Sequence, residues 1–308
     1  MLLSLRVNAL QIAPELRKNL VYEIIRNDIF LLNTKAKNQV LLELLAIKQD
    51  GLRHALLSLI SIVASTLKGV EYLLTNDQMI ITSLIQVVKQ MDPSLDGSVN
   101  QRFLIAILQK VSIKADTIPI FVDMQMIPFI IDLISRSLKS QRELDGGIVF
   151  SLDFSTALLA NILHESSTAT VLLKPANKKS LVQTISNLLQ LITEKRLPTS
   201  TLMHILICLS YLNKENFSNI AEQECGFSPL IEDFVTEYSK KPVIDNENDE
   251  IDKRTVLDLC AHMFHPKDFS GNDLSQSLDY NDMRPDDKIR EFENEQGDLI
   301  FECFQDEQ

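Results

Sequence analysis

The chain has 308 residues, a formal net charge of −12 at pH 7, 45% hydrophobic residues and only 8 glycines. The charge is uneven, because residues 1–244 carry a net charge of +1 whereas residues 245–308 carry −13. A body of about 240 residues buries enough surface to fold without disulfides or metals. Its balanced charge disfavours a nucleic-acid surface, which needs clustered Lys and Arg.

Cysteine spacing and hydropathy exclude further classes of protein. The N-terminal apolar stretch is interrupted by Arg6 and Asn8, so we expect no signal peptide. The most apolar window, residues 55–64, is shorter than the roughly 20 residues that a membrane-spanning helix needs. We therefore expect no membrane insertion. The cysteines are widely scattered, which indicates a reducing intracellular compartment: Cys208, Cys225, Cys260 and Cys303.

Apolar residues recur every three to four positions through residues 1–238, which is typical of helices. We expect five helices that each follow a side chain able to accept a hydrogen bond from the first turn: residues 36–47 after Thr34, 79–91 after Asn76 or Asp77, 102–113 after Ser98, 152–164 after Ser151 and 202–213 after Ser200. Prolines are expected at or just before helical runs, where the missing N–H costs nothing: Pro14, Pro128, Pro175, Pro198 and Pro229. The predicted fold class is all-α.

Two helix types alternate along the chain. Helices of the first type share two apolar residues, two mostly small or polar ones and one apolar residue. These segments start 48, 51 and 50 residues apart, at Leu59, Ile107, Leu158 and Cys208. The second type recurs at a similar interval, from Met79, Met126, Leu181 and Phe227. A two-helix repeat near this length predicts an armadillo/HEAT-like α-solenoid of about four to five repeats, with the extra residues in loops.

The domain organisation follows from the repeats and the charge. Residues 1–244 are predicted to form the armadillo-like repeat domain, and residues 245–308 an acidic, partly irregular tail. Residues 253–264 have the pattern of one last amphipathic helix that caps the repeats. Aromatic residues among acidic ones predict a short docking segment at 289–304. This segment either packs back on the repeats or reaches a partner, and either attraction should weaken with salt.

Motifs for catalysis and cofactor binding are absent from the sequence. It contains no G-x-x-x-x-G-K-[ST], G-x-G-x-x-G, H-E-x-x-H or G-x-S-x-G segment. We therefore expect no enzyme, no cofactor and no small-molecule substrate.

Two groups of His and Cys residues contain the side chains that a reactive thiol site or a metal site would need. His204 and Cys208 are spaced i, i+4, which could bring an imidazole and a thiol together, but their apolar neighbours favour a packing helix. Cys260, His262 and His265 form a cluster that lacks a fourth zinc ligand of ordinary geometry. No metal site is predicted.

A polar stripe is the candidate surface for partner proteins. On the helix that begins near Leu52, the residues His54, Ser58 and Ser61 lie on one side, opposite an apolar side. In an armadillo stack this helix type lines the concave face; the alternative interpretation is an ordinary solvated helix face. Later repeats and the tail complete the candidate set: His54, Ser58, Ser61, Arg102, Gln109, Lys110, Asn161, His164, Tyr211, Phe292, Phe301 and Phe304.

The repeats resemble known armadillo sequences. Leu158-Leu-Ala-Asn-Ile162 resembles the A-L-x-N-L signature, whose Asn clamps extended peptides in peptide-binding members, although the equivalent positions are Ile62, Lys110 and Tyr211. A closer resemblance is to the LisH-domain and armadillo-repeat-containing ciliary protein family, that of armadillo-repeat-containing protein nine. It covers roughly residues 20–240 and lies in ordered blocks: 26–33 with 39–45, 64–74, 106–112 and 152–162.

The resemblance implies a structural component of basal bodies and ciliary tips that acts on axonemal microtubules. Its partners would be proteins of a ciliary or cytoskeletal assembly, with microtubules contacted directly or indirectly. The chain departs from the family in having no N-terminal LisH or coiled-coil segment, so LisH-mediated dimerisation is not expected. The apolar N-terminus suits a shortened form, or one that a partner covers. The alternative is a cytoplasmic armadillo-type cargo or assembly adaptor without a ciliary role.

Overall fold

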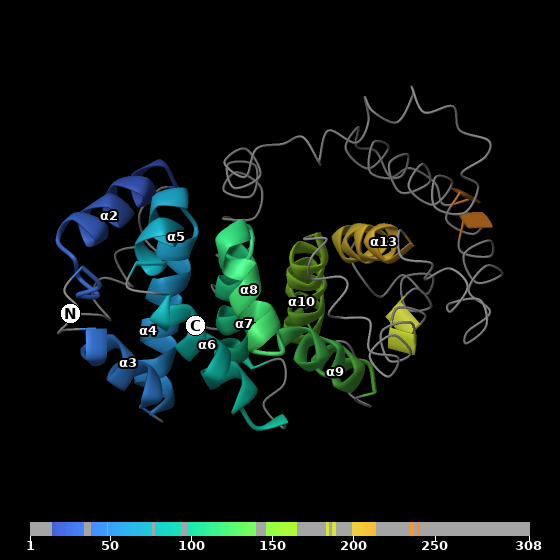
Figure 1. The fold of residues 1–308 in the computed structure, drawn as a ribbon, viewed down its shortest axis with the longest axis horizontal. Coiled ribbons are helices and arrows are strands. Elements are labelled where there is room, and N and C mark those ends of the chain that lie inside the picture. Colours follow the sequence, from blue (N-terminus) through green and yellow to red (C-terminus); the bar gives the residue numbers. More distant parts are fainter. Residues whose placement is uncertain are drawn as a thin grey trace. The chain divides into compact units, whose positions relative to one another are not determined.

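The structure of the protein is a computed structural model, shown in Figure 1. Secondary structure in the described part of the chain is helical, with no strand among those residues. This confirms the predicted all-α class at the level of secondary structure. The described residues are 14–33, 38–47, 49–75, 78–93, 98–139, 146–164 and 199–213, together with the pairs 183–184, 187–188, 235–236 and 239–240.

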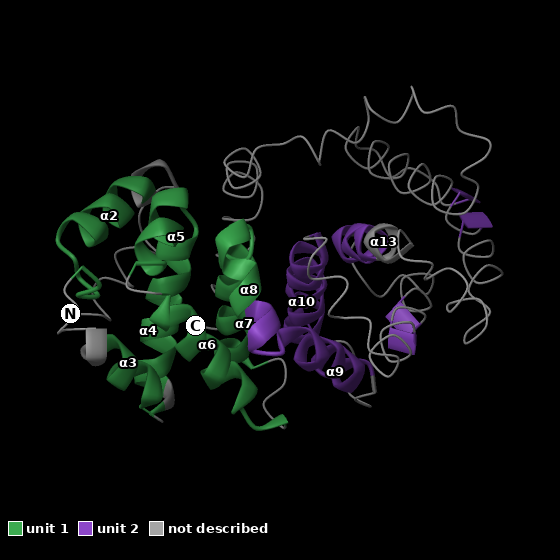
Figure 2. Cartoon of the chain, in the orientation of Figure 1, with its two compact units in different colours: residues 1–120, 283–308 green, residues 121–282 purple. Residues whose placement is uncertain are grey.

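These residues fall into two compact units, coloured separately in Figure 2. One contains the described residues up to Ile120 and the other those from Phe121 onward. The predicted boundary at residue 244 and the tail segments 253–264 and 289–304 lie outside the described residues.

The described part of the first unit contains helices α2 to α7, and three pairs of them pack together three elements apart. The pairs are α2 with α5, α3 with α6 and α4 with α7. Sequential neighbours also touch, as α3 does with α4 and α6 with α7. The helix bounds are α2 Pro14–Arg26, α3 Asn38–Ala46, α4 Asp50–Ala64, α5 Leu67–Leu73, α6 Met79–Lys89 and α7 Val99–Val111.

Helices α4 and α7 form the centre of the first unit. In α4 every residue from Ala55 to Ala64 is buried, and in α7 every residue from Gln101 to Val111 is buried. A helix that is buried on all sides cannot be assigned a solvent face from its polar residues alone. The Ser58 and Ser61 side chains are therefore interior groups of this unit, with 4% and 3% of their surface exposed.

The link between α4 and α5 requires a glycine at position 69. The Thr66 side chain caps α5 by accepting a hydrogen bond from the Gly69 N–H at 3.0 Å. A Cβ at Gly69 would lie 1.7 Å from the Val63 carbonyl oxygen, well inside van der Waals contact. The tight turn that brings α5 back onto the end of α4 is therefore possible only without a side chain here.

The second unit is centred on α10. This helix packs against α9 and α13, and it is buried along most of its length. It is long and apolar enough to cross a membrane by length and composition alone, but 67% of that stretch is buried within the structure. Packing therefore accounts for its apolar character. The described helices of the second unit are α9 Met126–Lys139, α10 Gly146–His164 and α13 Thr199–Asn213. Helix α8, Ile118–Asp123, follows a 3₁₀ turn at Ala115–Thr117 and contains the boundary between the units at Ile120.

The helix starts test the capping predictions. Ser98 caps α7, since its Oγ accepts from the Gln101 N–H at 3.5 Å, and Pro14 is the first residue of α2. The prediction for Ser151 is wrong, because α10 begins at Gly146 and Ser151 is a buried residue inside it. Ser200 is likewise the second residue of α13 rather than its cap. Pro128 is the third residue of α9, so it too lies in the first turn of a helix. The other predicted caps and prolines lie outside the described residues: Thr34, Asn76, Asp77, Pro175, Pro198 and Pro229.

The short helices α5 and α8 are additions to the predicted two-helix repeat. They have 7 and 6 residues, which is about two turns each. So few positions cannot display a helical period in the sequence. Within the described residues 50–139, the structure therefore has one short helix after each of α4 and α7 that the sequence did not predict.

Candidate functional site

The predicted partner-binding residues come from the central helices of both units, and most of those that the structure describes are buried. His54 and Asn161 are half-buried and His164 is exposed. The side chains of Tyr211, Phe292, Phe301 and Phe304 lie outside the described residues. The buried members of the set are Ser58, Ser61, Arg102, Gln109 and Lys110, each with 5% or less of its surface exposed. In this structure they do not offer an accessible docking face.

Lys110 joins α7 to α4 at the centre of the first unit. Its Nζ donates to the backbone carbonyl of Ser61 at 3.2 Å and approaches the Ser61 Oγ at 3.5 Å. At the other end of the same helix pair, the His54 and Phe103 rings meet edge to face, with 5.4 Å between centroids. The two helices are thus linked by an aromatic contact near their starts and a polar contact near their ends.

The Ser61 carbonyl lies in the last turn of α4, where carbonyl groups lack their intrahelical partners. The Ser65 N–H, the usual partner four residues on, donates instead to the Ile62 carbonyl at 3.2 Å. Thr66 donates to the next carbonyl, that of Val63. The Lys110 ammonium therefore satisfies an end carbonyl of a neighbouring helix, at the negative end of that helix's dipole.

Burial is the main influence on the charge of Lys110. Loss of hydration lowers the pKa of its ammonium from 10.5 to about 7. Helix α7 carries no Asp or Glu that could oppose this effect. Lys110 is therefore poised to gain or lose its proton near neutral pH.

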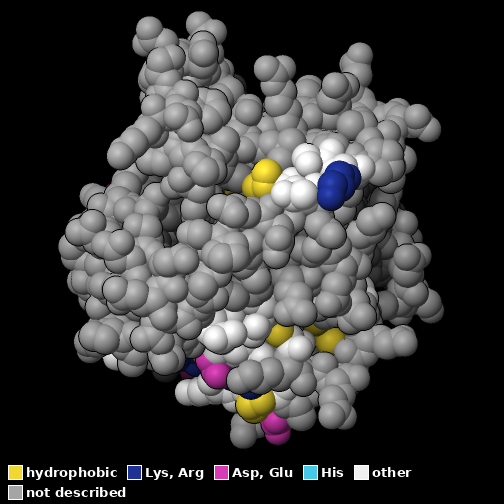
Figure 3. Space-filling model, turned by 90° about the vertical axis from the view of Figure 1, so that its right-hand side faces the viewer, with side chains coloured by type: hydrophobic (Ala, Val, Ile, Leu, Met, Phe, Trp, Pro, Cys, Tyr) yellow, Lys and Arg dark blue, Asp and Glu magenta, His cyan; other side chains and the backbone are white. Residues whose placement is uncertain are grey.

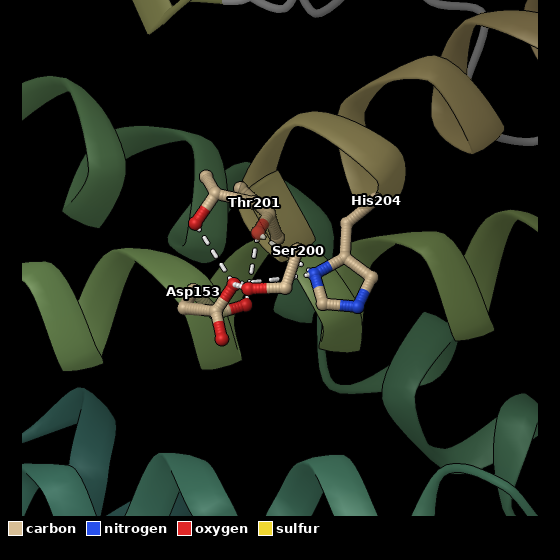
Figure 4. Close-up of polar contacts among 5 residues, drawn as sticks. Asp153, Ser200, Thr201 and His204 are labelled. Atoms are coloured by element: carbon tan, nitrogen blue, oxygen red, sulfur yellow. Dashed lines mark hydrogen bonds and ion pairs between the residues drawn. The ribbon is translucent and has the colours of Figure 1, made fainter. Parts of the chain in front are cut away.

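Asp153 plays a comparable role between α10 and α13 in the second unit, as Figure 4 shows. Its Oδ1 accepts hydrogen bonds from the Ser200 and Thr201 hydroxyls, both at 2.8 Å. The His204 Nδ1 lies 3.6 Å from the same oxygen and 3.5 Å from the Thr156 Oγ1. One carboxylate of α10 thereby binds three side chains in the first two turns of α13.

The carboxylate of Asp153 is stabilised in its charged form. Burial acts to raise its pKa, but the hydrogen bond and charge of His204, together with the Thr201 and Ser200 hydroxyls, outweigh burial and lower the pKa. A carboxylate also interacts favourably with the N-terminal end of a helix, where Ser200 and Thr201 lie. Asp153 is the only Asp or Glu in α10, and α13 has none.

The Asp153 cluster contains the residue types of a hydrolase triad in a different arrangement. In a Ser-His-Asp triad the nucleophilic hydroxyl is hydrogen-bonded to the histidine, which acts as its base. Here Ser200 and Thr201 both donate to the carboxylate, and the imidazole contacts that same oxygen. This geometry supports an interhelical connection rather than an activated nucleophile.

The structure describes only one of the two groups of His and Cys residues, that of His204 and Cys208. Burial raises the pKa of the Cys208 thiol, which keeps the group neutral, and the nearby His204 contacts Asp153 and Thr156. Among the residues that the structure describes, no group of three His, Cys, Asp or Glu is placed to hold a metal ion. Cys260, His262 and His265 lie outside the described residues.

Other polar contacts between helices have the same sequence separation. The Tyr72 hydroxyl donates to Asp28 at 2.7 Å and accepts from the Phe30 N–H at 3.1 Å. The Ser135 and Thr184 hydroxyls lie 2.8 Å apart. Together with the Lys110 and Asp153 contacts, these join residues 42 to 51 positions apart. That interval is close to the spacing of the helix repeat in the sequence.

Sequence reasoning missed Asp153, Thr201 and Tyr72 as contact residues. A usable signal for Asp153 was present, since it is a lone carboxylate in a 19-residue apolar helix and His204 follows 51 residues later. A charge that is retained in an apolar helix needs a partner. No comparable local pattern marks Tyr72.

The visible surface offers no larger site in the described part of the chain. On the face that Figure 3 shows, the described side chains form small separate patches of mixed kind. The exposed large hydrophobic residues in the described ranges are Tyr22 and Met79. A scan against protein-family models found no match, and a search of curated proteins found none either.

Proposed function

We propose that the protein is a non-enzymatic scaffold for protein–protein interactions, built from armadillo-like helical repeats. The observation that supports this proposal is the stacking of equivalent helices. In the first unit α2 packs on α5, α3 on α6 and α4 on α7, and in the second unit α10 packs on α13. Repeat proteins bury their cores in this way, because one repeat cannot cover its own apolar face.

The interhelical contacts support the repeat architecture independently of helix packing. Lys110 contacts Ser61 and Asp153 contacts Thr201, at separations of 49 and 48 residues. Contacts limited to neighbours one repeat away are the hallmark of a solenoid. Both pairs belong to the helix type that carries the repeat signature in the sequence.

The non-enzymatic part of the proposal is supported by the sequence and by the Asp153 cluster. The chain lacks the phosphate-binding and nucleophile motifs named above. Ser200 and Thr201, the hydroxyl side chains beside an imidazole, donate to a carboxylate instead of to that imidazole. No described group therefore has the arrangement of an activated nucleophile.

We further propose a structural role in a cilium or flagellum, at the basal body and ciliary tip. The support is the resemblance of residues 20–240 to the LisH-domain and armadillo-repeat-containing ciliary proteins. The partners would be proteins of the axonemal or cytoskeletal assembly, without nucleic acid, membrane insertion or a small-molecule substrate. A cytoplasmic cargo or assembly adaptor is the second candidate, because a helical repeat scaffold serves that role equally well.

Imaging and proximity labelling of a tagged full-length chain in ciliated cells separate these two candidates. The ciliary proposal predicts signal at basal bodies and ciliary tips, with labelled proteins of the axoneme and its microtubules. A diffuse cytosolic signal with unchanged cilia after depletion would contradict it and favour the adaptor. If proximity labelling captures no protein partner at any location, that result would count against the scaffold proposal itself.

The binding face can be tested at Asn161, which is half-buried on α10 and occupies the peptide-clamping position of the armadillo signature. We expect Asn161→Ala to weaken capture of the labelled partners at least tenfold, with little change in melting temperature. Met79→Ala is the matched control, because Met79 is exposed on a helix of the other type, α6. If Asn161→Ala and Met79→Ala weaken partner capture equally, the surface around Asn161 is not the binding face.

A further inference from the structure

Lys110 is a buried cation with an uncharged partner. It lies one residue before the end of α7, with 4% of its surface exposed, and its Nζ contacts the Ser61 carbonyl and hydroxyl of α4. A buried ammonium is costly unless a carboxylate compensates its charge. The carbonyl and hydroxyl of Ser61 supply dipoles and no charge, so they offset only part of the cost of burying the ammonium.

The surroundings of Lys110 offer no compensating carboxylate among the described residues. Its neighbour Lys114 is different, because it pairs with Glu71 at 3.4 Å and is partly exposed. The only charged residue of α6 is Lys89, which is exposed. Among the described side chains, none of the titratable residues on the elements around α7 has a hydrogen bond or ion pair with Lys110. These residues are Arg53 and His54 on α4, Lys68, Glu71 and Tyr72 on α5, and Lys89 on α6.

We propose that the Lys110–Ser61 contact is a proton-sensitive junction between α4 and α7, which is tight when Lys110 is a neutral amine and loosens when it is an ammonium. The neutral amine still donates a hydrogen bond to the Ser61 carbonyl, and its burial costs less desolvation free energy than burial of the ammonium. The ammonium gains hydration when the ends of the two helices separate, because its Nζ is then released from the Ser61 carbonyl. Acidification therefore favours an open arrangement of the helix pair at the centre of the first unit.

The direction of the pH effect follows from proton linkage. The pKa of Lys110 is about 7 in the folded protein and 10.5 in the unfolded chain. Between these values the unfolded chain binds more protons, so this group makes stability rise with pH. Its stabilising contribution is fully present above about pH 10.5 and is lost as the pH falls through about 7.

The direct test is a titration of the full-length protein with ¹³C-labelled lysine, followed by NMR at the Lys110 Cε. We expect a midpoint within one unit of pH 7, with the assignment made by its loss in Lys110→Met. A midpoint above about pH 10, the range of an ordinary lysine, overturns the proposal. This measurement uses the wild-type protein and does not depend on the folding of a variant.

Hydrogen exchange tests the opening itself. After correction for intrinsic rates, amides in residues 61–66 should exchange at least fivefold faster at about pH 6 than at about pH 8.5 in the wild type. In Lys110→Met this pH dependence should disappear, while Lys89→Met, which removes an exposed lysine of α6, should keep it. Unchanged pH dependence in Lys110→Met, or its loss in Lys89→Met, contradicts the proposal.

Discussion

At the scale of single residues, a buried lysine and a partly buried aspartate each join two helices. Lys110 contacts an end carbonyl of α4, and Asp153 binds the first turns of α13. A cation at a helix C-terminus and an anion at a helix N-terminus each interact favourably with the partial charge of that helix end. The partners of Asp153 outweigh burial and lower its pKa, which favours its charged form, whereas burial lowers the pKa of Lys110 to about 7, which disfavours its charged form.

Replacement of Asp153 by Asn should destabilise the protein by about 1–3 kcal/mol, because buried hydroxyl and imidazole donors lose a charged acceptor. The lowered pKa of Asp153 adds a pH signature. Its stabilising contribution is present above the unfolded Asp pKa of about 3.9 and is lost as the pH falls further. Urea unfolding should therefore show a smaller loss of stability in acid for Asp153→Asn than for the wild type.

The exposed ion pair of Arg136 with Asp132 on α9 offers a control for this experiment. Asp132→Asn removes the same charge from a site whose side chain is 62% exposed, and exposed pairs contribute little. Equal destabilisation by both substitutions would show that the contacts of Asp153 with α13 contribute no more than an exposed ion pair.

The Cys208 thiol should react slowly with thiol reagents in the folded protein. It is 1% exposed, and burial raises the pKa of its thiol, so the reactive thiolate is scarce. We expect labelling of Cys208 by Ellman's reagent, followed by peptide mass spectrometry, to be at least a hundredfold slower in the native than in the urea-unfolded protein. Rapid native labelling would restore the hypothesis of a His204–Cys208 reactive pair.

At the scale of helices, the connection between long helices depends on backbone contacts. The turn from α4 to α5 is completed by the Thr66 cap and by the close approach of Gly69 to the Val63 carbonyl. The short α5 then packs on α2, where the stacked Phe30 and Tyr72 rings and the Asp28 carboxylate hold it. A seven-residue helix is marginal alone, so these contacts are what stabilise it.

Substitution of Gly69 by Ala should destabilise the first unit by at least about 1–3 kcal/mol, because the new methyl group would overlap the Val63 carbonyl. Gly51→Ala is the matched control, since a Cβ at that position meets no atom within 4 Å. Alanine there should be neutral or stabilising, because Ala favours helices over Gly. Thermal unfolding monitored by circular dichroism distinguishes the two, and a harmless Gly69→Ala would refute the close approach.

At the scale of the whole molecule, charge separates the chain into a nearly neutral part and an acidic part. Residues 245–308 account for a net charge of −13, and residues 1–244 for +1. An acidic segment with interspersed aromatic residues can contribute long-range attraction toward basic partners. This property belongs to the sequence and needs no fixed conformation of the segment.

Deletion of residues 289–308 should reduce the salt dependence of partner binding. Attraction between exposed charges is screened, and the screening length falls to about 8 Å near physiological salt. We expect affinity of the full chain to fall several-fold between about 0.05 and 0.5 M NaCl, and affinity of the deletion variant to change less. Identical salt dependence in both proteins would exclude the tail from binding.

The all-α class and the approximate positions of the long helices were predictable from the sequence, because apolar spacing reports which side of a helix is buried. The helix expected over residues 102–113 is observed as Val99–Val111, and that over 202–213 as Thr199–Asn213. Helix starts were less predictable, as Ser151 shows, because an interior Ser and a capping Ser look alike in sequence.

The sequence by itself determined the helical class, the interval of about 50 residues between equivalent helices and the separation of charge, since each depends only on residue order and type. The tertiary structure decided what the polar residues of the central helices do. Ser61 belongs to the polar stripe of one helix and Lys110 to the corresponding positions of the next repeat, yet their side chains meet in the interior. The reason is physical: burial depends on which helices pack around a residue, and those neighbours lie a whole repeat away along the chain.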